Sequence, residues 1–398
     1  MNEGALERAY RDERAAVLAT ITRRLDGDLA LAEDVVQDAF VAAAVEWNRR
    51  GTPERPGAWL TTTAWRKALD RLRHERVAAA HAPELVDRDM SYDFELFDES
   101  SLQDDQLKLL FTCCHPALAP EARMALTLRS VAGLTVPEIA RGFLSSESAM
   151  ERRLTRARNK VSDARIPFRV PSDDLLVERL AGVLRVVYLV FNEGHALRPE
   201  LRAESIRLGR LLVRLMPDEA EVHGLLALFL LTDARSAARV VDGQLVSLAE
   251  QDRGLWDRAS ISEGVAVLER ALRLPRAGSY AIQAAIAAVH AEAPAFADTD
   301  WAQIAGLYEQ LLRHDPSPVV ALNRAVAVGF AEGPEAGLAA LPDDPRLERY
   351  APFYAARYEL LRRTGDADAA AAALDTAIAL TTNEAERDAL RNLKGQSL

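Results

Sequence analysis

The stretch from Gly133 to Val161 constrains this chain most, because it has the pattern of two short helices joined by a tight turn. Val136 to Phe143 predicts the first helix, with Ile139 and Ala140 facing inward. The turn comprises Leu144, Ser145 and Ser146, and the hydroxyl of its last serine can cap the next helix by accepting a free backbone N–H. The spacing therefore predicts a helix-turn-helix.

The second helix of this pair, which runs to about Val161, separates apolar from polar side chains. Its packed stripe, at i, i+4, i+7 and i+11, is Met150, Leu154, Ala157 and Val161. The opposite face carries Ser148, Arg152, Thr155 and Asn159, with Arg153, Arg156, Arg158 and Lys160 beside it. Arginine can bond guanine in the DNA major groove, and arginines at the rim can bond phosphates. A solvated basic helix is the alternative, but the preceding helix, the turn and the cap together favour DNA binding.

Charge supports a local contact with DNA. The chain has 398 residues and a net charge of −11, so it is not a general nucleic-acid binder. Glu121 to Arg165, however, carries nine basic and five acidic residues, whereas Glu84 to Lys108 carries nine acidic and two basic ones. A positive module inside an acidic chain indicates focused DNA contact.

The remaining composition indicates a soluble, cytoplasmic protein without a membrane segment. The only cysteines, Cys113 and Cys114, are adjacent and do not suit a disulfide framework. No apolar run approaches the roughly 18 residues of a membrane span, and the charged N-terminus lacks the apolar core of a signal peptide. Cys113, Cys114 and His115 lack the spacing of a zinc site, so a structural role is favoured over a metal site.

Two helices are predicted at the N-terminus, over Leu6–Leu25 and Leu29–Trp47. The second packs through Val35, Ala39, Ala42 and Ala43. Its outward strip is expected to contain Glu33, Asp34, Gln37, Asp38 and Val41. Such a strip is either solvated surface or a docking face for a basic partner.

A third helix is predicted over Gly57–Arg76, with a buried row of Leu60, Ala64, Ala68 and Leu72. Trp59 and Trp65 lie among several basic residues. Aromatic faces with cations around them suit single-stranded DNA, because unpaired bases stack on the rings and the cations hold the backbone. The alternative is that both tryptophans belong to the core.

The acidic segment from Ala82 to Gln106 has poor helical periodicity and is predicted to be a linker. It either mimics nucleic acid in a basic channel or is simply solvated. Helices over Asp105–Cys114 and Pro120–Ala132 are predicted to follow it and to lead into the helix-turn-helix.

From Asp174 onward the chain predicts helix after helix. The expected helices are Leu175–Asn192, Leu201–Leu215, Asp218–Leu231, Gly254–Arg273, Tyr280–Glu292, Trp301–Arg313, Pro318–Phe330, Tyr354–Arg363, Ala367–Leu380 and Glu384–Leu393. The last ones pair into units typical of tetratricopeptide repeats. The cluster Phe191 to His195, with Gly194 as a predicted C-cap, has no partner motif for catalysis through Glu193 and His195.

These residues resemble the extracytoplasmic-function sigma factors of the sigma-70 family. Ala32 to Phe40 looks like the core-binding helix of region 2, Pro56 to Arg73 like the −10-reading helix, and Gly133 to Val161 like the helix-turn-helix of region 4. The segments LLFTCCHPALAPEARMALTLR, RIPFRVP and NEGH resemble the subgroup with a large tetratricopeptide-like C-terminal extension.

The resemblance implies a role for particular residues. Those implied to bind the core polymerase are Asp34, Gln37, Asp38 and Phe40. Those implied to lie at the −10 element are Trp59, Thr62, Arg66, Asp70 and Arg73. Those implied to meet the −35 element are Ser148, Ala149, Arg152, Arg153 and Arg156. The family usually has Asn in place of Arg66 and an apolar branched residue in place of Thr63, so no −10 base preference is implied.

We therefore expect an all-α protein with sigma region 2 over residues 1–80, an acidic linker over 81–106, region 4 over 107–168 and a tetratricopeptide-like regulatory domain over 169–398. The expected function is promoter choice for RNA polymerase and help in melting the −10 region, with no metal, no organic cofactor and no enzyme activity. The C-terminal domain is expected to act within the chain or through a regulatory protein. The alternative is a stand-alone helix-turn-helix regulator with a repeat domain as its sensor.

Overall fold

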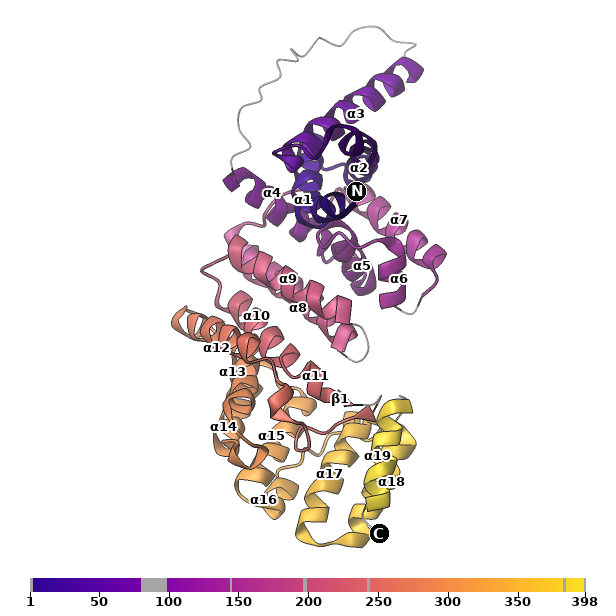
Figure 1. Cartoon of the computed structure of the whole chain (residues 1–398). Coiled ribbons are helices and arrows are strands. Elements are labelled where there is room, and N and C mark those ends of the chain that lie inside the picture. The colour runs from indigo at the N-terminus through magenta and orange to yellow at the C-terminus, as the bar shows by residue number, and fades with distance from the viewer. Residues whose placement is uncertain are drawn as a thin grey trace. The chain divides into compact units, whose positions relative to one another are not determined.

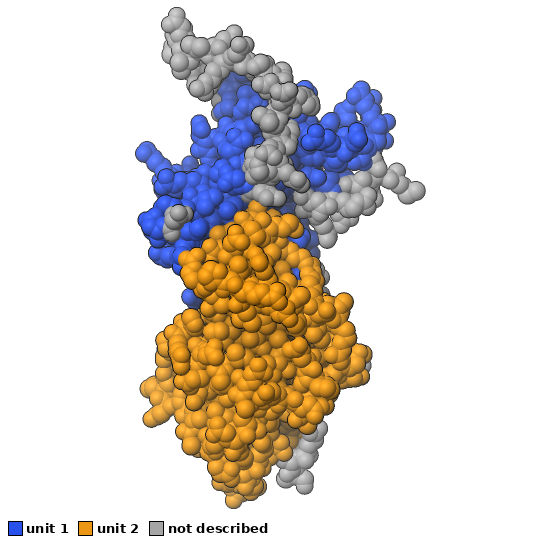
Figure 2. Space-filling view, turned by 90° about the vertical axis from the view of Figure 1, so that its left-hand side faces the viewer, with its two compact units in different colours: residues 1–208 blue, residues 209–398 orange. Residues whose placement is uncertain are grey.

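The computed structural model describes residues 3–79, 99–143, 145–195, 199–241, 244–381 and 384–396. The fold is all-α as predicted, apart from one pair of two-residue antiparallel strands, β1 (Val240–Val241) and β2 (Gln244–Leu245) (Figure 1). Contacts divide the chain into unit 1, residues 1–208, and unit 2, residues 209–398 (Figure 2). Among the described helices, none is both long and apolar enough to cross a bilayer.

Unit 1 begins with three helices that we call the N-terminal module: α1 (Glu3–Arg24), α2 (Leu29–Arg50) and α3 (Pro56–Ala79). Each of them contacts the other two. The side chain of Asp28 caps α2 by accepting the backbone N–H of Leu31. The predicted packing rows are confirmed, since Val35, Ala39, Ala43, Leu60, Ala64 and Ala68 are fully buried. Ala42 and Leu72, predicted in the same rows, are only half-buried.

Four further helices form what we call the helix-turn-helix module: α4 (Glu99–Cys113), α5 (Pro120–Ser130), α6 (Val136–Gly142) and α7 (Glu147–Asp163). Helix α4 begins at Glu99 and not near Asp105, so the predicted linker extends too far at its C-terminal end. The rest of that linker, residues 80–98, lies outside the described residues. Helix α4 packs against α1, which brings the two modules together in unit 1.

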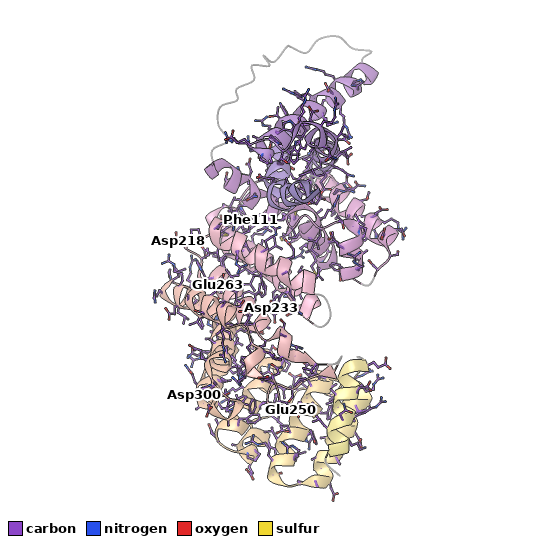
Figure 3. The ribbon with its side chains drawn as sticks, viewed as in Figure 1. Phe111, Asp218, Asp233, Glu250, Glu263 and Asp300 are labelled. Carbon is purple, nitrogen blue, oxygen red and sulfur yellow. The ribbon has the colours of Figure 1, made fainter. Side chains whose placement is uncertain are left out.

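Two helices of the predicted C-terminal domain contact the helix-turn-helix module. Helix α8 (Asp173–His195) packs on α4 and α5, and Nη2 of Arg179 donates to the carbonyl of Phe111, labelled in Figure 3, at 3.0 Å. From α9 (Pro199–Leu215), Nη2 of Arg207 donates to the carbonyls of Val131 and Ala132 at 3.2 and 3.1 Å. Gly194 lies inside α8, so its predicted role as C-cap is wrong.

Unit 2 is built from short helices that pack on their neighbours in the chain, for example α14 on α15 and α17 on α18. A helix predicted over Gly254–Arg273 is interrupted, because Asp257 caps a new helix at Arg258. The tetratricopeptide-like arrangement stays a prediction. The elements are α10 (Ala220–Asp233), α11 (Ser236–Arg239), η1 (Arg253–Leu255), α12 (Arg258–Arg273), α13 (Ser279–Glu292), η2 (Phe296–Asp298), α14 (Trp301–His314), α15 (Pro318–Ala331), α16 (Pro334–Ala339), η3 (Pro345–Leu347), α17 (Ala351–Thr364), α18 (Ala367–Leu380) and α19 (Glu384–Gln396).

The close approach of α10 to the start of α13 depends on Gly224. A Cβ atom at this position would lie 2.5 Å from the backbone nitrogen and 2.8 Å from the Cα of Ala281. We expect Gly224→Ala to lower the free energy of unfolding of unit 2 by about 1–3 kcal/mol, because backbone atoms must move to admit the methyl group. Gly306→Ala is the control: no atom lies within 4 Å of its added Cβ, so it should raise helix stability by about 0.5–1 kcal/mol. Urea unfolding measures both, and equal stability of the two variants would contradict the prediction.

His290 makes unit 2 sensitive to acid. Burial, with the nearby guanidinium groups of Arg235 and Arg253, lowers the pKa of His290 from 6.5 to about 4. Between these values the folded chain binds fewer protons than the unfolded chain, so stability falls as the pH falls. We expect this side chain to account for roughly 2–3 kcal/mol of that loss. Thermal melts from pH 7 to pH 4 should therefore drop more steeply for the wild type than for His290→Gln; parallel curves would contradict this.

Candidate nucleic-acid interface

The second helix of the helix-turn-helix is fixed at its start by capping bonds. The Ser146 hydroxyl accepts the backbone N–H of Ala149 at 3.2 Å, as predicted. The preceding helix has a full capping box, which sequence reasoning missed: the Thr135 hydroxyl accepts from the backbone of Glu138, and the Glu138 carboxylate accepts from the backbone of Thr135. Leu144, in the predicted turn, lies outside the described residues.

The back of α7 is buried, which turns its other face outward. Met150, Leu154, Ala157 and Val161 are each at most 3% exposed, so the predicted stripe is confirmed, and α7 packs through it on α5 and α6. Ile139 and Ala140 of α6 are buried as expected. The exposed residues on the outward face are Ser148, Arg152, Thr155, Arg156 and Asn159. Ala149 and Arg153, the remaining predicted −35 contacts, are half-buried.

The arginines of α7 differ in their partners. No carboxylate among the described residues forms an ion pair with Arg152, Arg153 or Arg156. Arg153 lies over the Phe143 ring at 5.8 Å, and Nε of Arg156 donates to the carbonyl of Arg152. Arg158 is different, because its Nη1 donates to a carboxylate oxygen of Glu33 at 2.9 Å. The outward face thus presents positive charge that the described fold does not neutralise.

Helix α2 presents a second candidate face. The face is acidic in the N-terminal half of the helix and apolar in the C-terminal half. Asp34 and Asp38 both accept from Arg71 of α3, at 3.2 and 2.8 Å. Burial acts to lower the pKa of Arg71, but the hydrogen bonds to Asp34 and Asp38 raise it, and the pKa lies above its ordinary value. One and two turns further on, Val41 and Val45 are 62% and 61% exposed. The exposure of Val41 confirms its predicted place on the outward strip, whereas Val45 was not predicted there, although its spacing from Asp34 places it on the same face.

Other predicted residues of α2 lie differently. Gln37 is exposed, as expected of a contact residue. Phe40 is only 7% exposed and packs edge-on against Tyr10 at 5.0 Å, so it supports the helix from behind. Glu33 was expected on the outward strip but is 5% exposed, and that expectation is wrong. Glu33 is buried because groups of the helix-turn-helix module, which are far away in the sequence, cover its carboxylate.

The predicted −10 residues lie along α3. Trp59 is half-buried, with its ring edge-on to the buried Trp47 at 5.6 Å, so it is partly core and partly surface. Trp65 is half-buried beneath Arg24 at 5.3 Å. Thr62 is half-buried, with its hydroxyl donating to the carbonyl of Ala58. The exposed members of the set are Arg66, Asp70 and Arg73, the last two forming an ion pair at 3.5 Å.

The other clusters that the sequence singled out are buried or undescribed. Cys113 and Cys114 are buried free thiols in and after α4, and burial raises the pKa of Cys114 to about 11. Burial likewise raises the pKa of Cys113. The side chains of Glu193 and His195 lie outside the described residues.

The cap of α7 gives a test of how this face is held. We expect Ser146→Ala to lower the free energy of unfolding of unit 1 by about 0.5–2 kcal/mol, because a backbone N–H loses its acceptor. Asn159→Ala, on the exposed face of the same helix, should be nearly neutral. Chemical unfolding followed by circular dichroism measures both, and an unchanged midpoint for Ser146→Ala would contradict the prediction.

Comparisons with known proteins divide the chain in the same order. The model of sigma-70 region 2 matches residues 10–77, and that of sigma-70 region 4 matches residues 108–161. A family of unknown function (DUF6596) matches residues 179–272. No solved structure matches the chain.

Curated relatives agree with these matches. The chain is 45% identical to the uncharacterized protein R00370 of Rhizobium meliloti, over 92% of this chain and 89% of that protein. It is 30% identical to the probable ECF RNA polymerase sigma factor SigI of Mycobacterium tuberculosis, over 43% of this chain and 59% of SigI. It is 45% identical to the ECF RNA polymerase sigma factor SigL of the same organism, over 19% of this chain and 42% of SigL. With regions 2 and 4 in order and a helical extension behind them, the chain belongs to the extracytoplasmic-function sigma factors of the sigma-70 family, in the subgroup with a large C-terminal extension.

Proposed function

We propose that this chain gives core RNA polymerase its choice of promoter, with α7 bound to the −35 element and α3 at the −10 element. The observation that carries the proposal is the outward face of α7. Its arginines lie opposite a buried stripe, and no carboxylate of the described residues pairs with them. A rigid helix with such a face can enter the major groove, where arginine reads guanine and neighbouring arginines hold phosphates.

The docking face for core polymerase is the outward strip of α2. Asp34, Gln37 and Asp38 offer it carboxylates and an amide, and Val41 and Val45 add exposed apolar area. A polar strip with an apolar end suits a basic partner surface that buries the valines on binding. The names of SigI and SigL, RNA polymerase sigma factors, support this partner.

Helix α3 supplies the groups for opening the −10 region. Trp59 presents part of its ring at the surface while Trp47 holds the other part, so an unpaired base can stack on a ring that is already fixed. Arg66 and Arg73 are exposed on the same helix and can bond the backbone of the strand.

The C-terminal helices are proposed to regulate this activity in the cytoplasm, by contact with the sigma regions or with a protein partner. Stacked helix pairs of the tetratricopeptide type offer large protein-binding surfaces. The arrangement of α14 with α15 and of α17 with α18 supports this, as does the turn at Gly365, which takes the left-handed conformation that ends α17. The proposal requires no metal, no cofactor and no chemical step by the chain.

Run-off transcription tests the proposal. Core polymerase of the source bacterium would be incubated with fragmented genomic DNA, with and without the purified chain. We expect transcripts that depend on the chain and that fall at least tenfold with Asp38→Arg, because the reversed charge repels a basic docking surface. The wild type should also co-purify with core polymerase, and Asp38→Arg should not.

Glu348→Arg, an exposed charge reversal in unit 2, is the control and should transcribe like the wild type. Thermal melts must show that Asp38→Arg remains folded, since Asp38 also bonds Arg71. Polymerase that transcribes equally well without the chain would refute the proposal. Tight binding of the chain alone to a symmetric duplex site would instead favour a stand-alone regulator.

A further inference from the structure

Two arginine side chains of unit 2 lie over one buried tryptophan. Arg235 follows α10, Arg253 belongs to η1, and Trp256 follows η1 and is 3% exposed. The Cζ atoms of Arg253 and Arg235 lie 4.4 and 6.0 Å from the centroid of the indole ring. Two cations are therefore held near one another on the same aromatic side chain, where their repulsion acts against the fold.

Arg253 is bound by the protein only in part. It is 8% exposed, and its Nη1 donates to the carbonyls of His290 and Ala293 at 2.6 Å each, at the C-terminal end of α13. A guanidinium suits this end of a helix, because the last carbonyls lack partners and the helix dipole is negative there. Its Nη2, however, is buried and has no acceptor in the described part of the chain. One nitrogen of the fork therefore remains available for a further acceptor.

Arg235 has no partner of opposite charge among the described residues. It is half-buried, and apart from its contact with the indole ring it forms no hydrogen bond or ion pair with them. Burial, together with the charges of Arg239 and Arg253, lowers the pKa of Arg235 to about 10. The group keeps its charge at neutral pH, so the cost of burying it is not relieved by loss of a proton.

The acidic side chains close to these arginines in the sequence are bonded elsewhere. Glu250, labelled in Figure 3, accepts from a serine hydroxyl, Asp252 caps η1, and Asp257 caps α12. Asp298 acts on Arg253 through its charge, but it is exposed and forms no ion pair with that guanidinium. The described fold therefore leaves the two guanidinium groups without a neutralising anion.

Two neutral donors lie beside the pair. Nε1 of Trp256 and Nδ1 of His290 are buried and have no partner among the described residues. Burial, followed by the charges of Arg235 and Arg253, lowers the pKa of His290 to about 4, so the imidazole lies near both guanidinium groups and is neutral at pH 7. An indole nitrogen can only donate, and one neutral tautomer of histidine presents an N–H at Nδ1. The cluster thus combines two cations with two unused neutral donors.

We propose that Arg235, Arg253, Trp256 and His290 form a binding site for a phosphate dianion, either free or as the monoester group of a small solute. Phosphate suits this set because its two negative charges match two guanidinium groups and its oxygens accept several hydrogen bonds. A bound dianion joins the segment after α10, the η1 turn and the end of α13. The site goes beyond the proposed function, because it lies wholly in unit 2 and requires neither DNA nor polymerase.

Isothermal titration calorimetry of the full chain with inorganic phosphate at pH 7 tests the site. We expect one saturable site, and Arg235→Met should weaken binding at least about tenfold, because a charge-assisted hydrogen-bonding partner is lost. Trp256→Phe, which keeps an aromatic ring but removes the N–H, should weaken binding by a smaller factor. Arg313→Met is the control: it makes the same charge change at an exposed position of α14 and should bind like the wild type.

A second titration, with glycerol 3-phosphate, distinguishes the two sources of the dianion. Tighter binding of the ester than of inorganic phosphate would identify a phosphorylated solute as the ligand. Equal or weaker binding of the ester would identify free phosphate.

Thermal melts separate a ligand-binding role of Arg235 from a structural one. Without phosphate, Arg235→Met should melt at or above the wild-type temperature, because it removes an uncompensated buried cation. Added phosphate should raise the melting temperature of the wild type and of Arg313→Met, but not that of Arg235→Met, since a ligand stabilises only the fold that binds it.

The absence of saturable binding at millimolar phosphate would overturn the site. Equal affinity of Arg235→Met and the wild type would overturn it as well, because the anion would then bind elsewhere on the surface. If Arg235→Met fails to fold, Trp256→Phe decides the outcome, and unchanged affinity in that variant would refute the site. These measurements do not involve transcription, so the site and the proposed function can fail separately.

Discussion

A helix can present a defined chemical surface only if its opposite side is held, and the packed stripe of α7 meets that condition here. Met150, Leu154, Ala157 and Val161 dock on α5 and α6, so the buried side of the helix fixes the direction of the arginine face. The same relation holds for α2, where Val35, Ala39 and Ala43 anchor a helix whose other side is acidic and apolar. Apolar burial thus positions the polar groups on the exposed side of each helix.

The contact between the two modules combines two kinds of interaction, because α1 packs on α4 and buried polar groups join α1 and α2 to α5 and α7. Apolar packing is tolerant of small displacements, whereas a buried carboxylate needs its donors at hydrogen-bond distance. Glu33 has two such donors, both from the other module, and Arg14 finds its acceptors across the same boundary.

The sequence predicts unit 2 as a series of helices. Small residues at the contacts allow these helices to pack closely. Gly224 lets α10 approach the backbone of α13, and Gly329 lies against Gly337 where α15 meets α16. Trp301 stacks on Phe330 at 4.4 Å, which ties the starts and ends of neighbouring helices together. Acidic residues labelled in Figure 3, such as Glu263, serve surface ion pairs, here with Arg210 at 2.8 Å.

The sequence alone determined most of the helices and packed faces, the cap at Ser146 and the resemblance to the family, because hydrophobic period and capping chemistry are local properties of the chain. It also placed Asp34, Gln37, Arg152 and Arg156 on exposed faces. It could not place Glu33, whose neighbours Ser130 and Arg158 are far away in the chain and whose burial depends on a second module. Nor did it predict that α8 packs on α4 and α5, because an apolar helix face does not specify which helix covers it. Those choices belong to tertiary structure, where the free energy depends on surfaces brought together from distant parts of the sequence.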